Sequence, residues 1–181
     1  MLKGSYVALV TPFNVDGSVN FDKLRELIEY HISNKTAGLV ILGTTGEATT
    51  ISLEEQIEVV KFSLEIVNKR IPVMIGSGSN DTKKACELSK LYSSMGADYL
   101  LVVTPYYNKA TQRGLIESFR AIADASTKPC ILYNVPSRTG CNLTPATCAI
   151  LAEHPNIVGI KEASGNISQI AEIAALTKGE F

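Results

Sequence analysis

Six apolar segments, each followed by a helical pattern, constrain the fold of this chain more than any other feature of its sequence. Their apolar residues run almost continuously instead of alternating with polar ones, which is typical of parallel strands covered on both faces. We expect strands over residues 5–11, 38–43, 71–76, 98–104, 128–134 and 156–161. Helical spacing or helix-capping residues predict helices over residues 21–34, 52–68, 81–95, 111–125, 144–153 and 167–177.

Two architectures accommodate six consecutive βα units: an open, doubly wound sheet and a (β/α)8 barrel. A nucleotide-binding open sheet would carry a third glycine after Gly76 and Gly78, but Asp81 stands there instead. We interpret this segment as a turn in which Asn80 caps the next helix. The nucleotide-binding alternative therefore loses most of its support. A barrel needs eight strands and commonly about 250 residues, so 181 residues would hold only six of its units.

Composition and charge exclude several classes of function. The chain is 45% hydrophobic with a formal net charge of -1, so we expect one domain with a sizeable core and no pull toward nucleic acid or an anionic membrane. The apolar runs are too short for a transmembrane helix, and the first residues lack the apolar stretch of a secretory signal. The four cysteines lack metal-ligand spacing, which predicts reduced thiols in a cytoplasmic protein. The two histidines lie in no ligand cluster, so we expect no metal site.

Lys161 needs a particular explanation because it ends the apolar strand expected over residues 156–161. A cation at the end of a core strand is costly to bury unless it is paired or neutral. Side-chain alternation places Ile157, Gly159 and Lys161 on one face of this strand. Lys161 could simply extend to water. Alternatively, it could be desolvated, have a lowered pKa and act as a neutral nucleophile toward a ketone.

Other polar side chains follow strands at the same end. Thr44 and Thr45 follow the second strand and offer hydroxyls that can hold a carboxylate. Tyr133 ends the fifth strand, and Arg138 follows it with a charge suited to an anionic substrate. Each also has an ordinary explanation: a turn, a core tyrosine and a solvated arginine. In a barrel, however, the strand ends converge, so Thr44, Tyr133 and Lys161 would meet at one site.

These groups fit a Schiff-base aldolase better than a hydrolase. A phenol beside a neutral lysine can transfer the protons of carbinolamine formation and dehydration. A carboxylate-binding group next to them would select a 2-keto acid. The sequence contains neither a G-x-S-x-G nucleophile elbow nor a metal-binding cluster.

In combination, these motifs resemble those of the dihydrodipicolinate synthases, in the pyruvate-dependent class I aldolase family that also contains N-acetylneuraminate lyase. The resemblance covers essentially all 181 residues and rests on Gly4-Ser5, Val10-Thr11-Pro12, GTTGE at 43–47, VTPYYN at 103–108, YNVPSRTG at 133–140 and GIKEASGN at 159–166. It implies a (β/α)8 barrel without a metal or organic cofactor. Residues 1–181 would form strands 1–6 and helices 1–6, with strands 7 and 8 and a C-terminal helical region absent.

The resemblance also implies a lyase that condenses pyruvate with L-aspartate 4-semialdehyde to give 4-hydroxy-tetrahydrodipicolinate, in lysine and diaminopimelate biosynthesis. Lys161 matches the lysine that forms the Schiff base with pyruvate, and Tyr133 matches the tyrosine that relays protons to it. Thr44 matches the threonine that links two tyrosines of this relay. Tyr107 matches the second tyrosine, which reaches a neighbouring subunit's site, so a homo-oligomer (a dimer or tetramer) is expected.

Two further positions match substrate-binding residues of the family. Thr45 matches a carboxylate-holding position, and Arg138 matches the arginine that binds the carboxylate of the semialdehyde. Both favour the synthase over N-acetylneuraminate lyase, and Arg138 also favours it over an aldolase for 2-keto-3-deoxy sugar acids. These two enzymes remain alternatives, together with an inactive barrel fragment. Leu53, Gln56 and Lys84 stand where lysine-inhibited members carry polar residues, so we expect weak or absent inhibition by lysine.

Overall fold

The chain folds as the first six βα units of a (β/α)8 barrel. The computed structural model describes residues 2–179 and 181, and within them six parallel strands alternate with helices along the chain. The chain divides into two compact units. The N-terminal unit comprises Leu2–Gly76 and Met95–Tyr99, and the C-terminal unit comprises Ser77–Ser94 and Leu100–Phe181.

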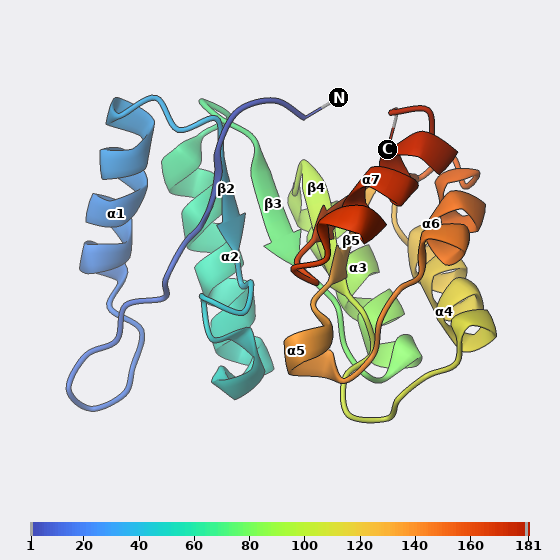
Figure 1. Cartoon of the computed structure of the whole chain (residues 1–181). Helices are drawn as coiled ribbons and strands as arrows, with labels where there is room; N and C mark the ends of the chain where they lie inside the picture. The colour runs from blue at the N-terminus through green and yellow to red at the C-terminus, as the bar shows by residue number, and fades with distance from the viewer. Residues whose placement is uncertain (1, 180) are drawn as a thin grey trace. The chain divides into compact units, whose positions relative to one another are not determined.

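The N-terminal unit contains three parallel strands in chain order and the helices that connect them. Its elements are β1 (Tyr6–Ala8), α1 (Phe21–Ser33), β2 (Gly38–Ile41), the 3-10 helix η1 (Ala48–Thr50), α2 (Leu53–Val67) and β3 (Val73–Gly76). Leu39 on β2 pairs with Val7 on β1 and with Val73 on β3. The helices α1 and α2 lie side by side (Figure 1), with the Phe21 and Phe62 rings edge to face at a centroid distance of 5.0 Å.

Local sequence signals explain where these helices begin. Asn20 Oδ1 accepts a hydrogen bond from Lys23 N–H at the start of α1. At α2, Ser52 and Glu55 form the predicted capping box, in which each side chain accepts from the backbone N–H of the other residue. Asn68 ends α2 in the left-handed conformation, which asparagine tolerates better than most residues.

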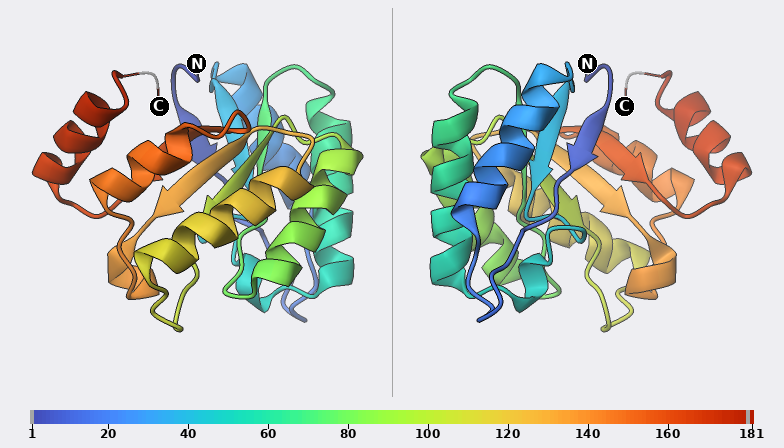
Figure 2. Two further views of the ribbon diagram at one scale, coloured as in Figure 1. Left: turned by 90° about the vertical axis from the view of Figure 1, so that its right-hand side faces the viewer. Right: turned by 90° about the vertical axis from the view of Figure 1, so that its left-hand side faces the viewer.

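The C-terminal unit contains the second half of the parallel series. Its elements are α3 (Thr82–Met95), β4 (Tyr99–Val103), α4 (Gln112–Ala125), β5 (Cys130–Asn134), α5 (Pro136–Thr139), α6 (Pro145–Ala152), β6 (Ile157–Glu162) and α7 (Ile167–Leu176). The last residues of α3 and the first of β4 belong to the N-terminal unit. Strand β5 pairs with β4 and β6, and Figure 2 shows α7 packed beside α6.

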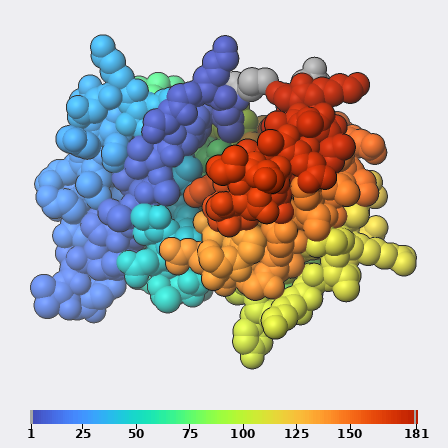
Figure 3. All heavy atoms as spheres, viewed as in Figure 1, coloured from blue at the N-terminus to red at the C-terminus, as the bar shows by residue number. Residues whose placement is uncertain are grey.

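The core of this unit lies between its strands and helices. Leu132 on β5, Phe119 on α4 and Leu151 on α6 are almost fully buried, and each large apolar side chain buried in this way contributes about 1.5–3 kcal/mol. Ile167, Ile170 and Leu176 on α7 remain exposed, and Figure 3 shows α7 at the surface. None of the helices in the described residues is long and apolar enough to cross a membrane.

The structure corrects several predicted boundaries. The first strand is shorter than expected, Tyr6–Ala8; Leu9 N–H still donates to Val40 O at 3.0 Å, and Thr11 Oγ1 then donates to Gly46 O at 2.7 Å. Asn80 was expected to cap the third helix, but Asp81 does so: its Oδ1 accepts from Lys83 N–H at 2.9 Å. Two short helices, η1 and α5, lie where only loops were expected.

Candidate active site

The centre of the candidate site is the pair formed by Lys161 and Tyr133 in the C-terminal unit. The parallel register of β5 and β6 sets Tyr133 opposite Lys161. The Lys161 ammonium nitrogen lies over the Tyr133 ring, 4.4 Å from its centroid. Both residues were predicted near the ends of neighbouring strands, and the structure places each of them one residue before the last residue of its strand, which is Asn134 in β5 and Glu162 in β6.

The environment of Lys161 makes it easier to deprotonate than an ordinary lysine. Lys161 is exposed, yet desolvation by the surrounding protein atoms lowers its pKa from the usual value. The Tyr133 ring face, in turn, attracts the charged form of an amine that lies over it. A lowered pKa increases the fraction of neutral amine, the form that attacks a carbonyl.

Tyr133 is fixed by burial and by its backbone. Its side chain is only 7% exposed, and its carbonyl accepts from Thr104 N–H at 3.0 Å, just beyond the end of β4. A ring held in this way cannot turn freely away from Lys161. The structure therefore agrees both with a core tyrosine and with a phenol held beside a reactive amine.

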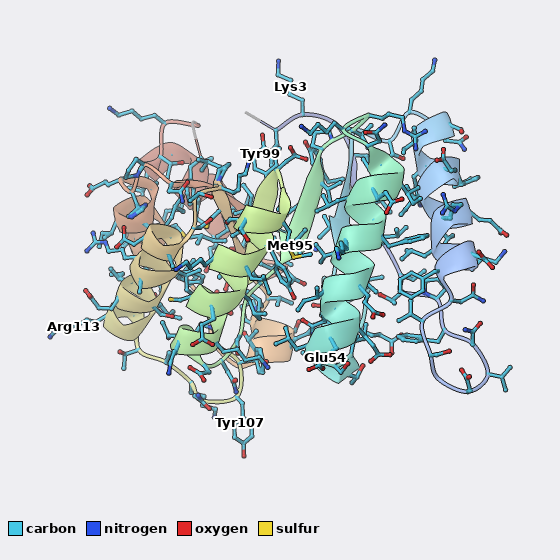
Figure 4. All side chains as sticks on the ribbon, turned by 180° about the vertical axis from the view of Figure 1, so that it is seen from behind. Lys3, Glu54, Met95, Tyr99, Tyr107 and Arg113 are labelled. Atoms are coloured by element: carbon cyan, nitrogen blue, oxygen red, sulfur yellow. The ribbon has the colours of Figure 1, made fainter. Side chains whose placement is uncertain are left out.

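Arg138 and Tyr107 lie in two segments of the C-terminal unit that contact each other. Arg138 is exposed on α5, which ends at Gly140 in the left-handed conformation. Tyr107 N–H donates to Thr139 O at 3.2 Å, which joins the loop after β4 to α5. Tyr107 itself has a φ of 73° and is 88% exposed, and Figure 4 shows its side chain pointing away from the protein. A tyrosine held in a strained conformation and directed outward is more typical of a binding surface than of a core.

Thr44 and Thr45 lie in the N-terminal unit, in the loop that follows β2, and both are exposed. The loop is held closed because Gly46 N–H donates to Gly43 O at 3.0 Å and Thr11 Oγ1 donates to Gly46 O. A Cβ at position 46 would lie 3.1 Å from Leu9 O, so glycine suits this close approach. The contribution of Thr44 and Thr45 to a site with Lys161 stays a prediction.

A group of polar residues next to the Lys161–Tyr133 pair was not predicted. Asn134 and Glu162 each follow one member of the pair, and their side chains are hydrogen-bonded at 2.9 Å. Gln169 at the start of α7 bonds to the same carboxylate oxygen of Glu162 at 3.0 Å. One signal in the sequence could have indicated the contact between Asn134 and Glu162: each stands one position after a member of the pair, at the end of its strand.

The described residues contain no group of three or more histidine, cysteine, aspartate or glutamate side chains that could hold a metal ion. The four thiols are free; Cys130, Cys141 and Cys148 are buried, and Cys86 is half-buried. Burial raises the pKa of Cys130 to about 11 and that of Cys148 to about 12. A raised thiol pKa makes a cysteine a poor nucleophile at neutral pH.

The fold and the site define a (β/α)8-barrel protein with a lysine and a tyrosine side by side at the C-terminal ends of adjacent strands. The chain belongs to the Dihydrodipicolinate synthetase family, whose family model matches residues 1–181.

Individual relatives agree with this assignment. The chain is 57% identical over 181 residues to 4-hydroxy-tetrahydrodipicolinate synthase 1 of Clostridium acetobutylicum, covering 100% of this chain and 61% of that protein. It is 58% identical over 176 residues to the 4-hydroxy-tetrahydrodipicolinate synthase of Geobacter metallireducens, covering 97% of this chain and 60% of that protein. The chain therefore spans about three fifths of the length of these relatives.

A solved structure matches the fold. The crystal structure of the chloride-inhibited dihydrodipicolinate synthase of Acinetobacter baumannii, complexed with pyruvate, superposes with a TM-score of 0.98 at 48% sequence identity. The match covers 100% of this chain and 62% of the other.

Proposed function

We propose that the protein carrying this chain condenses pyruvate with L-aspartate 4-semialdehyde through a Schiff base on Lys161, giving 4-hydroxy-tetrahydrodipicolinate. The observation that carries the proposal is the position of the Lys161 amine over the Tyr133 ring together with its lowered pKa. The relatives bearing the name of this synthase and the pyruvate complex of one of them support the choice of substrates.

The proposed reaction begins when the neutral Lys161 amine attacks the ketone carbon of pyruvate. A carbinolamine forms and loses water, leaving an imine between Lys161 Nζ and that carbon. Loss of a methyl proton gives an enamine, whose carbon forms a new bond to the aldehyde carbon of the semialdehyde; the C=O double bond of the aldehyde opens, and its oxygen takes up a proton to become a hydroxyl group. The amino group of the product then attacks the imine carbon, which closes the ring and releases Lys161 as a free amine.

Each remaining site residue has a proposed role in these steps. Tyr133 transfers protons to and from the carbinolamine, and Thr44 links it to Tyr107 in a relay. Thr45 holds the pyruvate carboxylate. Arg138 binds the carboxylate of the semialdehyde, for which the bidentate geometry of a guanidinium is well suited.

Several wider features belong to the same proposal. The reaction uses no metal or organic cofactor, since the imine itself supplies the electron sink. The protein acts in the cytoplasm, in lysine and diaminopimelate biosynthesis. It forms a homo-oligomer, a dimer or tetramer, in which the outward-pointing Tyr107 reaches a neighbouring site; its 88% exposure in this chain supports that role.

Weak or absent inhibition by lysine is also proposed. The Gln56 amide donates to Ala48 O and Ile51 O, both at 2.8 Å, which holds this side chain against the backbone of its own unit. Leu53 is apolar and Lys84 adds a positive charge that would repel the ligand. Inhibition of turnover by lysine below the millimolar range would contradict this proposal.

Borohydride trapping tests the Schiff base. The protein is incubated with pyruvate, reduced with sodium borohydride and digested, and the peptides are weighed by mass spectrometry. We expect the pyruvate adduct on the peptide that contains Lys161. A matched variant, Lys161→Arg, keeps the positive charge but cannot form an imine, and it should give no adduct. Absence of an adduct in the folded wild-type protein, or an adduct on another lysine, would reject the mechanism.

A further inference from the structure

A set of hydrogen bonds surrounds the carboxylate of Glu162 at the end of β6. Asn134 Nδ2 and Gln169 Nε2 donate to Glu162 Oε2 at 2.9 Å and 3.0 Å. The backbone N–H of Ser164 donates to Oε1 at 2.6 Å. Every one of these partners is a donor, which matches an ionised carboxylate, since that group accepts at both of its oxygens.

The amides that hold this carboxylate are themselves fixed. Asn134 is fully buried; its Oδ1 accepts from Leu143 N–H at 2.9 Å, and its Nδ2 also donates to Asn142 Oδ1 at 2.9 Å. Gln169 exchanges hydrogen bonds with Asn142 in both directions, at 2.9 Å and 3.2 Å. Because these partners determine which way each amide points, the Glu162 carboxylate has one orientation that satisfies them all.

This arrangement lies directly beside the candidate nucleophile. Asn134 pairs with Glu162 in the same register that sets Tyr133 opposite Lys161. Successive side chains of a strand point to opposite faces, so an anchored Glu162 fixes the direction of Lys161. Beyond them, Ala163 N–H donates to Asn134 O at 2.8 Å and continues the strand pairing. The strand is therefore held on both sides of Lys161.

We propose that Glu162 is a positioning residue for Lys161: through Asn134 and Gln169 it fixes the end of β6, so that the Lys161 amine stays over the Tyr133 ring. This inference rests on the proposed Schiff-base function of Lys161. Glu162 touches no reacting atom; it acts through the strand that carries the lysine.

A pair of variants separates this role from a general effect on stability. In Glu162→Gln, an NH2 group replaces one carboxylate oxygen and must face an N–H donor whichever way the amide turns. Adding Gln169→Glu supplies an acceptor for that NH2 group and for Asn142 Nδ2, at unchanged total charge. The double variant should therefore restore the hydrogen bond between positions 162 and 169, whereas Asn134 Nδ2 and Asn142 Oδ1 lose the partners that Glu162 Oε2 and Gln169 Nε2 supply.

A control variant changes the same region without touching the carboxylate. Asn166 caps α7, where its Oδ1 accepts from Gln169 N–H at 3.1 Å. Asn166→Ala should lower the melting temperature by about 2–4 °C. It should leave the rate of adduct formation and the pKa of Lys161 as in the wild-type protein.

Two measurements on the intact protein decide the question. The first is the rate of borohydride-trapped adduct formation at saturating pyruvate, which should fall about 10- to 100-fold in Glu162→Gln and recover in part in the double variant. The second needs no substrate: competitive acetylation across pH, read by mass spectrometry, gives the pKa of Lys161. We expect Glu162→Gln to raise it toward the usual value, because a displaced lysine regains water.

The outcomes are distinguishable. A fall in the pKa of Lys161 in Glu162→Gln would identify a simple charge effect and overturn the proposal. So would an equal loss of rate in Asn166→Ala, or no recovery in the double variant. If the wild-type protein forms no adduct with pyruvate, the proposed function fails, while the acetylation measurement still decides whether Glu162 positions Lys161.

Discussion

The Lys161 ammonium nitrogen lies 4.4 Å from the centroid of the Tyr133 ring, across the β5–β6 pair. Two opposing effects meet at this contact. The ring face favours the charged amine, whereas desolvation favours the neutral one and lowers the pKa of Lys161. The effect of removing only the hydroxyl of Tyr133 can therefore be measured separately from the effect of removing its ring.

Tyr133→Phe should keep the ring over which Lys161 lies and remove only the proton-transferring hydroxyl. We expect the rate of condensation to fall about 10²- to 10⁴-fold, with the pKa of Lys161 nearly unchanged. Steady-state turnover with both substrates measures the first effect, and acetylation across pH measures the second. Tyr30→Phe, at an exposed position on α1, is the control and should be fully active. Wild-type turnover in Tyr133→Phe would remove the tyrosine from the mechanism.

Lys161→Met should make the folded protein more stable at neutral pH. The folded state holds Lys161 at a pKa below the usual 10.5, so folding disfavours the charged form. This cost is fully present below the folded pKa and disappears as the pH rises past the unfolded value. Methionine retains the apolar stem without the charge.

Thermal melts at a series of pH values test this prediction. The melting temperature of Lys161→Met should exceed that of the wild-type protein at pH 7, and the difference should shrink toward pH 10.5. Lys90→Met, at an exposed position on α3, should show no such gain. A lower melting temperature for Lys161→Met at pH 7 would mean that Lys161 stabilises the fold instead.

The thiols should react in a fixed order with a disulfide reagent at pH 8. Burial raises the pKa of Cys148 to about 12, with the negative charge of Glu162 contributing, and that of Cys130 to about 11. Almost no thiolate is then present at either position. We expect Cys86, the half-buried thiol, to react first and the other three only on unfolding. In Cys86→Ser the early phase should vanish; its persistence would show that a buried thiol is accessible.

Two glycine substitutions should have opposite effects on stability. A Cβ at Gly76 would lie 2.1 Å from Leu42 O, and because the obstructing atom belongs to the backbone, Gly76→Ala should cost about 3 kcal/mol or more. Gly114→Ala, inside α4 with its nearest neighbour at 3.4 Å, should add about 0.5–1 kcal/mol through helix propensity. Urea unfolding measures both. Equal stability of the two variants would contradict the close approach at Gly76.

Features that depend on local pattern could be predicted from the sequence. The capping box of α2 and the six apolar strands are examples, since each is specified by residues close together in the chain. The helix α5 was missed because four residues are too few to show a helical period. The sequence could not decide between Asn80 and Asp81 as the cap of α3, because asparagine and aspartate are equally suited to that position. The structure shows that Asp81 is the cap.

The candidate site was predictable only in part for a different reason. The positions of Lys161 and Tyr133 at strand ends follow from hydrophobic runs. The register that sets them opposite each other arises when the strands pair, and one sequence does not contain it. The hydrogen bonds of Glu162 depend on that register and on Gln169, seven residues further along the chain, so they too required the structure.

The register of β5 and β6 also determines whether a Schiff base can form beside Tyr133. If β6 were to slip by one residue, every side chain would exchange faces, and a carboxylate rather than an amine would stand opposite Tyr133. Such a molecule would be unable to form an imine opposite Tyr133. The yield of trapped adduct per mole of folded protein would therefore count the molecules whose strands have paired correctly, and would make Lys161 a chemical reporter of assembly fidelity.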